Sequence, residues 1–335
     1  MPTATPSATP LPSPTPIEPT AAPSGWSQLV PAGDQPPARY DHSALFDPVR
    51  GQLLVFGGRG EGPLGDTWAF DLAARTWREI AGPGPEPRLG HGAVYDAATR
   101  RMIVVMGQGS GGGFFNDAWA FDLDQEPWVQ LRANDTGSGP RPRYGQSAAL
   151  DGGGRVLISH GFSDQGRFDD TWAFDLASNA WVELTPAQGI RPLKRCLHEL
   201  NYDADRNQLI LFGGCSSGFG PCPQGDLWAF DLSSQTWAEL KPSGDTPSAR
   251  SNPSLVYDGD SGRSWLFGGL AAGGPSAESW SYDIDSGVWA RLEAVDGPSA
   301  RSSQSASRNA QTGGILMFGG LTANGPSADL WEWNS

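Results

Sequence analysis

Two series of tryptophans run through the chain at nearly the same spacing. The first series is Trp68, Trp119, Trp172, Trp228, Trp280 and Trp331, and the second is Trp26, Trp77, Trp128, Trp181, Trp237 and Trp289. Both series recur about every 53 residues. A period of this length indicates a repeat architecture, in which one supersecondary unit is copied and each copy buries its apolar surface against its neighbours.

Each copy holds four short segments suited to β-strands, which we name strands a, b, c and d. In the first copy they span about residues 41–46, 52–57, 67–72 and 76–80. Strand b, with LLVF at 53–56, is apolar at odd and even positions alike, so the side chains on both faces of the strand are apolar. This predicts a sheet packed on both faces. Turns rich in Asp, Gly and Asn separate a from b and c from d, as in hairpins. These patterns predict an all-β chain that forms a six-bladed β-propeller.

The two ends of the chain indicate how the ring closes. The last copy stops at DLWEWNS (329–335), after its strand c, whereas the first tryptophan of the second series lies in GWSQLV (25–30), before any strand a. Placing 26–30 beside 330–334 supplies the missing strand d of the sixth blade. We therefore expect a propeller over residues 25–335, closed by an N-terminal strand that completes the last blade.

Residues 1–24 have a different composition. They hold eight prolines and almost no large apolar side chains, so we expect a disordered Pro/Thr-rich stalk or linker. Stalks of this kind commonly tether surface modules. We therefore expect an extracellular or cell-surface protein, although no export signal is visible in this sequence.

Several repeat positions carry a family resemblance. Glycine doublets follow strand b at Gly57-Gly58, Gly213-Gly214, Gly268-Gly269 and Gly319-Gly320, with departures at Gly107-Gln108 and His160-Gly161. An aspartate precedes the second-series tryptophan in five copies, at Asp71, Asp122, Asp175, Asp231 and Asp283. Over residues 26–335 this pattern resembles the kelch repeat, in the type of propeller that forms the central domain of galactose oxidase. The resemblance implies a kelch β-propeller, a fold that serves protein binders, glycan binders and a few enzymes.

Charge excludes two classes of partner. The formal net charge is −14, and nucleic acids and anionic membranes both require basic surfaces. The apolar runs are far shorter than the ~20 residues that span a bilayer, so membrane insertion is not expected. Proteins, glycans and neutral ligands remain as possible partners, and the sequence does not determine the oligomeric state.

Two sets of charged residues recur at fixed repeat positions. Six arginines open strand a: Arg39, Arg88, Arg143, Arg195, Arg250 and Arg301. Six carboxylates open strand c: Asp66, Asp117, Asp170, Asp226, Glu278 and Asp329. Both sets belong at the same end of the blades. Because the two sets are equal in number, we expect each arginine to pair with a carboxylate and brace the loops. This leaves fewer arginines free to contact a ligand.

The titratable side chains near the axis offer one candidate for catalysis. His42, His91 and His198 each lie three residues after a repeat arginine, which indicates a recurring structural position and no metal site or cofactor. Glu199 is different, because the same position in the other copies is serine or glycine. We expect a salt bridge from Glu199 to Lys194 or Arg195. The alternative gives Glu199 and His198 acid–base roles in an axial pocket.

The loops that join b to c vary most, and loops commonly carry function. Six of their side chains have no role in the repeat template, and we take them as candidate ligand-binding residues: Arg59, Phe114, Phe115, Arg167, Phe168 and Phe219. Exposed aromatic rings with arginines suit a protein or glycan surface. The same rings could instead pack on one another and hold the loops.

Three cysteines allow one disulfide in an exported protein. Cys215 and Cys222 flank SSGFGP in the longest b–c loop, and we favour this pair. The strand register also places Cys196 opposite Cys215, so a Cys196–Cys215 bridge is the rival.

These observations favour an extracellular kelch-repeat binding module that recognises a protein or a glycan through its b–c and d–a loops, without enzyme activity. The alternative is a carbohydrate-active enzyme similar to the bacterial kelch-type sialic acid mutarotase, although that family's catalytic residues do not map onto this chain position by position. A structural spacer is a third possibility.

Overall fold

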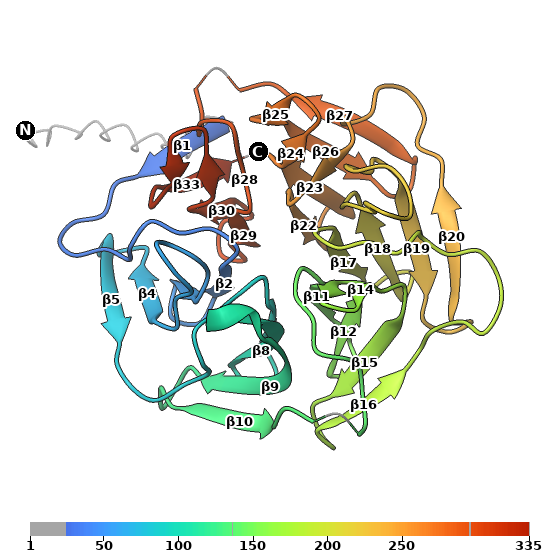
Figure 1. The fold of residues 1–335 in the computed structure, drawn as a ribbon. Coiled ribbons are helices and arrows are strands. Elements are labelled where there is room, and N and C mark those ends of the chain that lie inside the picture. Colours follow the sequence, from blue (N-terminus) through green and yellow to red (C-terminus); the bar gives the residue numbers. More distant parts are fainter. Residues whose placement is uncertain (1–24, 136, 295, 335) are drawn as a thin grey trace, which may run out of the picture.

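The computed structural model describes residues 25–135, 137–294 and 296–334. Within them, six antiparallel sheets of four strands surround a central axis as the blades of a propeller (Figure 1). The predicted stalk, residues 1–24, lies outside the described residues. No helix in the described part of the chain is both long and apolar enough to cross a membrane.

The predicted strands a to d appear in every blade, and in the first blade their bounds agree with the prediction to within two residues. From the innermost strand outward, blade 1 is β2 (Ser43–Asp47), β3 (Gln52–Phe56), β4 (Thr67–Asp71) and β5 (Thr76–Ile80). Blade 2 is β7 (Gly92–Asp96), β8 (Arg101–Gly109), β9 (Phe114–Asp122) and β10 (Trp128–Arg132). Blade 3 is β11 (Ser147–Leu150), β12 (Arg155–Ser159), β15 (Thr171–Asp175) and β16 (Ala180–Glu183).

Blades 4 to 6 repeat the same order. Blade 4 is β17 (Glu199–Asp203), β18 (Gln208–Phe212), β19 (Leu227–Asp231) and β20 (Thr236–Leu240), and blade 5 is β22 (Ser254–Asp258), β23 (Arg263–Phe267), β26 (Ser279–Asp283) and β27 (Val288–Leu292). Blade 6 is β29 (Ser305–Arg308), β30 (Ile315–Phe318), β33 (Leu330–Asn334) and β1 (Gly25–Leu29).

The b–c and d–a loops carry short strands and one 3₁₀ turn on one face of the ring, the loop face. These are β6 (Arg88–Leu89), η1 (Ser110–Gly112), β13 (Phe162–Ser163), β14 (Gly166–Arg167), β21 (Arg250–Ser251), β24 (Leu270–Ala271), β25 (Gly274–Pro275), β28 (Arg301–Ser302), β31 (Leu321–Thr322) and β32 (Gly325–Pro326). The a–b and c–d turns lie on the opposite face, the turn face.

The N-terminal strand closes the ring as predicted. β1 pairs antiparallel with β33 over its whole length, from Gly25 opposite Asn334 to Leu29 opposite Leu330, and Figure 1 shows the two strands side by side. The ring of Trp26 packs edge-on against those of Phe267 (4.9 Å) and Trp333 (5.6 Å). The joint therefore buries aromatic surface as well as pairing backbone.

The core lies between blades. Six apolar clusters each join two neighbouring sheets; the one between blades 6 and 1 includes Leu53, Val55, Trp77, Leu316 and Phe318. This arrangement explains why strand b is apolar at both parities, because both faces of each sheet are covered.

One detail of the repeat alignment was wrong. The position of the glycine doublet in blade 2 is taken by Met106-Gly107, with φ angles of 64° and 107°, and not by Gly107-Gln108. Met106 accepts the arginine bond that Gly57 accepts in blade 1. Met106 stands 18 residues after Arg88, the same spacing that separates Gly57 from Arg39, so the repeat spacing is kept and the predicted doublet was placed one residue too late.

Candidate functional site

An arginine–carboxylate pair braces the loop face of every blade. The six arginines are at most 1% exposed, and each donates to the carboxylate that opens strand c of its own blade. The pairs are Arg39–Asp66, Arg88–Asp117, Arg143–Asp170, Arg195–Asp226, Arg250–Glu278 and Arg301–Asp329, with shortest N···O distances of 2.5–2.7 Å. The predicted bracing role of these residues is therefore present in the structure.

Further bonds satisfy both partners of each pair. In blade 1, Arg39 also donates to the carbonyl oxygens of Pro37 and Gly57, and the indole N–H of Trp68 donates to Asp66. Burial opposes ionisation of Asp66, but the hydrogen bonds and charge of Arg39 outweigh it and hold the pKa of that carboxyl below its ordinary value. The arginines are occupied on all sides, so they are not free to bind a ligand.

Two residues after each arginine, the backbone forms a closed ring around the axis. Each amide N–H donates to the carbonyl oxygen of the equivalent residue in the preceding blade, at 2.6–3.0 Å. The members are Asp41, Gly90, Gly145, Leu197, Asn252 and Ser303, all with φ between 50° and 65°. This hydrogen-bonded ring narrows the axial channel at the loop face.

The channel widens away from this ring. A cavity of about 80 Å³ lies next to it, and Glu199 borders this cavity and a wider one of about 570 Å³. The wider cavity is lined by the innermost strands and by turn residues such as Pro48, Ala97 and Ala310. It therefore extends toward the turn face.

The expected salt bridge from Glu199 to Lys194 or Arg195 was wrong. Arg195 pairs with Asp226, and Lys194 lies 3.9 Å from Asp169. Glu199 instead accepts a hydrogen bond from the hydroxyl of Ser147, at 3.0 Å, across the boundary of blades 3 and 4. Burial, reinforced by the nearby charge of Asp41 and opposed by the Ser147 bond, raises the pKa of Glu199 to about 8. Glu199 is thus a protonated acid at neutral pH.

The histidines occupy a structural position between blades. His42 and His91 pack edge-on against Phe318 and Phe56 of the preceding blades, and His198 packs against His160. Burial, followed by the charges of neighbouring groups, holds the pKa of His198 well below its usual range. A neutral His198 is a poor general acid at pH 7, so the structure brings it beside Glu199 without giving it that role.

Two of the six candidate loop residues have a packing role. Arg88 lies 4.2 Å from the ring centroid of Phe115, and Arg143 lies 4.1 Å from that of Phe168. Both rings stand two residues before the paired carboxylate, where the other copies have leucine, glutamine or serine. The structure thus brings Phe115 and Phe168 onto the buried arginines, as the loop-holding alternative describes.

Phe114, beside Phe115, faces the surface. Its ring lies 6.0 Å from that of Tyr144 and 6.3 Å from that of Phe162. It lines a groove of about 460 Å³ on the loop face between blades 2 and 3, with Asn116, Pro140, Pro142 and Gln165 among the other walls. Phe114 is therefore half-buried, with part of its ring bordering this groove.

Arg167 and the cysteines hold the neighbouring loop of blade 4. Arg167 donates to the carbonyl oxygens of Cys215 (3.0 Å) and Ser217 (2.7 Å). The structure joins Cys215 to Cys222, the favoured pairing, with the sulfur atoms 2.15 Å apart. Cys196 is a buried thiol and lies opposite Cys215 in a β-bridge, as the register predicted.

The disulfide loop presents Phe219, whose side chain is 52% exposed. Lys194 lies 5.5 Å from its ring, and Leu193, 46% exposed, contacts the adjacent Gly220. We call Leu193, Lys194 and Phe219 the blade 4 patch. Arg59 is also exposed, but it lies apart from this patch, where its backbone pairs with Tyr40 in blade 1.

Sequence reasoning missed two residues that matter here. Leu193 was overlooked because d–a loops have no repeat template. Asp41 was overlooked although the repeat alignment contains the signal, since the other members of its ring are uncharged. Burial raises the pKa of Asp41 to about 6, against the Ser303 hydrogen bond and the charge of Arg59.

Six closed blades, each with a buried arginine pair and a left-handed doublet after strand b, define a kelch-type propeller. A family model described as the KLHDC2/KLHL20/DRC7 Kelch-repeats domain matches residues 20–214 and 201–335. The chain therefore belongs to the kelch-repeat family.

Similarity to curated proteins covers most of this chain. Acyl-CoA-binding domain-containing protein 4 of Arabidopsis thaliana is 26% identical over 286 residues, which is 81% of this chain and 41% of that protein. Human Host cell factor 1 is 26% identical over 263 residues, 73% of this chain and 12% of that protein. Adagio-like protein 1 of Oryza sativa subsp. japonica is 29% identical over 264 residues, 69% of this chain and 40% of that protein.

The chain thus spans less than half the length of these relatives. The similarities support a protein-binding module. Among the described residues, no three His, Cys, Asp or Glu side chains converge as a metal site requires.

Proposed function

We propose that this kelch propeller binds a partner protein through its loop face over blades 2 to 4. The observation that carries the proposal is the blade 4 patch, where Phe219 and Leu193 are about half exposed beside the cation of Lys194. The loop is tethered by the Cys215–Cys222 disulfide and by Arg167, so an exposed aromatic ring is held in place before a partner arrives. Preorganised aromatic side chains with a cation are typical of binding hot spots.

The groove that Phe114 lines extends this surface. It lies across the β13–β14 hairpin from the blade 4 patch, and the same hairpin carries Arg167. A partner that covers both features would contact loops that differ from blade to blade. The short, nearly identical b–c loops of blades 5 and 6 carry no aromatic side chain, although Leu270 of blade 5 is 44% exposed.

Quantitative affinity capture from the source cells tests this proposal. We expect the double variant Leu193→Ser, Phe219→Ser to lose most of the captured partner, and purified partner to bind the variant at least tenfold more weakly. The matched control is Val129→Ser, which removes a side chain that is 51% exposed on the outer strand β10. Equal binding by wild type and double variant would place the contact surface elsewhere.

The finer proposals are a glycan ligand on the same face and an extracellular setting. The exposed aromatic Phe219 suits sugar stacking as well as protein contact, and a glycan array with the same variants separates the two ligands. The disulfide supports an oxidising compartment. Peptide mapping of protein from its native source, without reduction, checks the setting: three free thiols would contradict it.

A second candidate function is sugar chemistry in the axial channel. It is favoured by Glu199, a carboxyl with a raised pKa that borders the wide cavity. A mutarotation assay by NMR, with Glu199→Gln as the inactive comparison, tests this candidate.

A further inference from the structure

Buried polar atoms without a hydrogen-bond partner surround the smaller axial cavity. Gln146 and Gln304, 4% and 6% exposed, border both cavities and leave their Oε1 atoms unpaired. Their amide nitrogens are directed elsewhere, to the carbonyl oxygens of Val105 and Phe267. The ring of His198 and the carboxyl of Glu199 line the same cavity. Two unpaired amide oxygens at one cavity indicate a polar occupant, since buried polar atoms are normally satisfied.

The charges that face this space are unbalanced. Asp41 and Glu199 are the acids that line the smaller cavity, and within the described residues no lysine or arginine lines it with them. The histidines there, His42, His91 and His198, are held neutral because burial lowers their pKa values. The smaller cavity therefore offers acceptors and negative charge, which a hydrogen-bond-donating cation complements.

The wider cavity is suited to an organic chain. Aromatic or apolar side chains occupy five of the six equivalent positions near its mouth: Phe46, Tyr95, Leu150, Tyr202 and Tyr257. The sixth is Arg308, whose charge is paired with Asp258 and Asp260. A volume of about 570 Å³ lies within the range of small-molecule sites.

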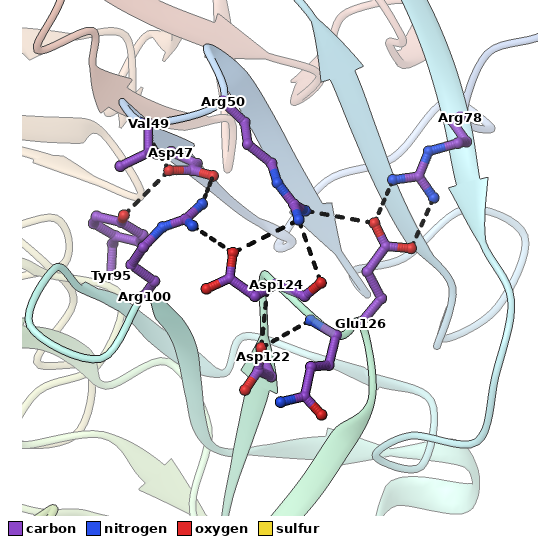
Figure 2. Close-up of polar contacts among 10 residues, drawn as sticks. Asp47, Val49, Arg50, Arg78, Tyr95, Arg100, Asp122, Asp124 and Glu126 are labelled. Carbon is purple, nitrogen blue, oxygen red and sulfur yellow. Dashed lines mark hydrogen bonds and ion pairs between the residues drawn. The ribbon is translucent and has the colours of Figure 1, made fainter.

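Carboxylates paired with arginines hold the hydroxyls of two tyrosines that line the wider cavity. The hydroxyl of Tyr95 donates to Asp47 at 3.2 Å, and Asp47 pairs with Arg100 at 3.0 Å. Figure 2 shows how Asp124 and Glu126 continue this network toward Arg50 and Arg78. Tyr257 donates in the same way to Asp203, at 3.2 Å. Tyrosine rings whose hydroxyls are held by carboxylates favour a cation at their faces.

We propose that the axial channel binds a small organic cation, a primary alkylammonium or a polyamine, with its ammonium head at Glu199 and its chain in the wider cavity. This site goes beyond the loop-face function, since it is entered from the opposite face. An ammonium group donates three hydrogen bonds, which suits the carboxyl of Glu199 and the unpaired oxygens nearby. Its positive charge also stabilises the carboxylate form of Glu199, which burial otherwise disfavours.

Binding is therefore coupled to proton release. The free site carries Glu199 as a carboxylic acid below pH 8, whereas the bound site carries a carboxylate beside the ammonium ion. Well below pH 8, one proton leaves to solvent for each cation bound as the O–H bond of Glu199 breaks, and no other covalent bond changes. Because the amine keeps its charge up to about pH 10, affinity rises with pH from 6.5 to 8.5.

Isothermal titration calorimetry with 1,5-diaminopentane tests the proposal. We expect binding to the wild-type chain that tightens about 25-fold between pH 6.5 and 8.5, with buffer-dependent heats that report the released proton. Glu199→Ser, which introduces the residue that stands at this position in four other blades, should abolish binding without unfolding the ring. Glu79→Gln, on the outer strand β5, is the control with an unchanged affinity.

Three results would overturn the proposal. They are absence of wild-type binding at millimolar amine, equal binding by Glu199→Ser, and equal binding of the uncharged 1,5-pentanediol. The last result would show that the channel recognises hydroxyl groups. The loop-face proposal is unaffected by any of them, because Leu193 and Phe219 lie outside the channel.

Discussion

At the scale of single residues, burial separates two kinds of ion pair in this propeller. Arg88 and Asp117 have side chains that are 0% and 5% exposed, whereas Arg78 and Glu126 are 51% and 31% exposed. Removing one partner of a buried pair leaves the other charge without water or a counter-ion. We expect Asp117→Asn to reduce the free energy of unfolding by about 3–5 kcal/mol.

The matched exposed change is Glu126→Gln, which should alter that free energy by at most about 1 kcal/mol. Urea unfolding of both variants at pH 7 provides the comparison. Similar losses of unfolding free energy for the two variants would mean that the six buried arginine–carboxylate pairs do not stabilise the propeller as we infer.

Glu199 makes stability depend on pH in the opposite direction from the paired carboxylates. Its folded pKa, about 8, lies above its unfolded value, so the unfolded chain releases this proton first as pH rises. Stability is therefore lost from about pH 4.5, the unfolded value, up to pH 8. Glu199→Gln removes this loss, so the variant should gain stability relative to wild type between pH 5 and 8. A constant difference in urea midpoint would contradict the raised pKa.

Repetition decided which of these residues could be predicted. The arginine–carboxylate pairs follow from two positions that recur six times, and Glu199 was noticed because it breaks such a position. Its bond to Ser147 could not be predicted, because that contact crosses from one blade to the next and depends on side-chain direction. Phe115 and Phe168 occupy a repeat position at which the other copies carry different residue types. Their packing on Arg88 and Arg143 therefore follows no recurring sequence pattern.

At the scale of elements, β1 contributes both backbone pairing and the Trp26 ring. Trp26→Ala should reduce the free energy of unfolding by about 3–5 kcal/mol, since it leaves a cavity beside Phe267 and Trp333. Val30→Ser, which changes a side chain 67% exposed just after β1, should have little effect. Removal of residues 1–24 should leave the melting temperature unchanged, whereas removal of 1–31 should lower it sharply. Equal melting temperatures for the two truncations would contradict closure by β1.

The strands were predictable because apolar runs and turn residues alternate at a fixed period. The doublet of blade 2 was predictable as well, because it begins 18 residues after the repeat arginine, as in blade 1, although we placed it one residue too late. The irregular pairing of β8 with β9 nearby leaves this spacing unchanged.

At the scale of the whole molecule, the ring could be predicted from the tryptophan count, whereas the two axial cavities could not. Their size depends on how closely six innermost strands approach the axis, which no single repeat encodes. The same closure makes a prediction about where the chain can be cut. Gly25 lies opposite Asn334, so a hairpin linker of about 2–5 residues would join the present ends.

Two circular permutants with this linker test how much stability comes from completing one blade with strands from both ends of the chain. New ends between Ser233 and Ser234, in the exposed c–d turn of blade 4, would again complete one blade with strands from both ends of the chain. New ends between Gln188 and Gly189, in the exposed loop between blades 3 and 4, would leave the ring closed by contacts between two whole blades, namely side-chain packing and a few backbone hydrogen bonds on the loop face such as Leu197 N–H to Gly145. We expect the first permutant to unfold close to the wild-type midpoint in urea and the second to unfold at a lower concentration, because only in the first do strands from both ends of the chain pair within one four-stranded sheet. Equal midpoints would show that packing between blades, and not the shared sheet, holds the ring closed.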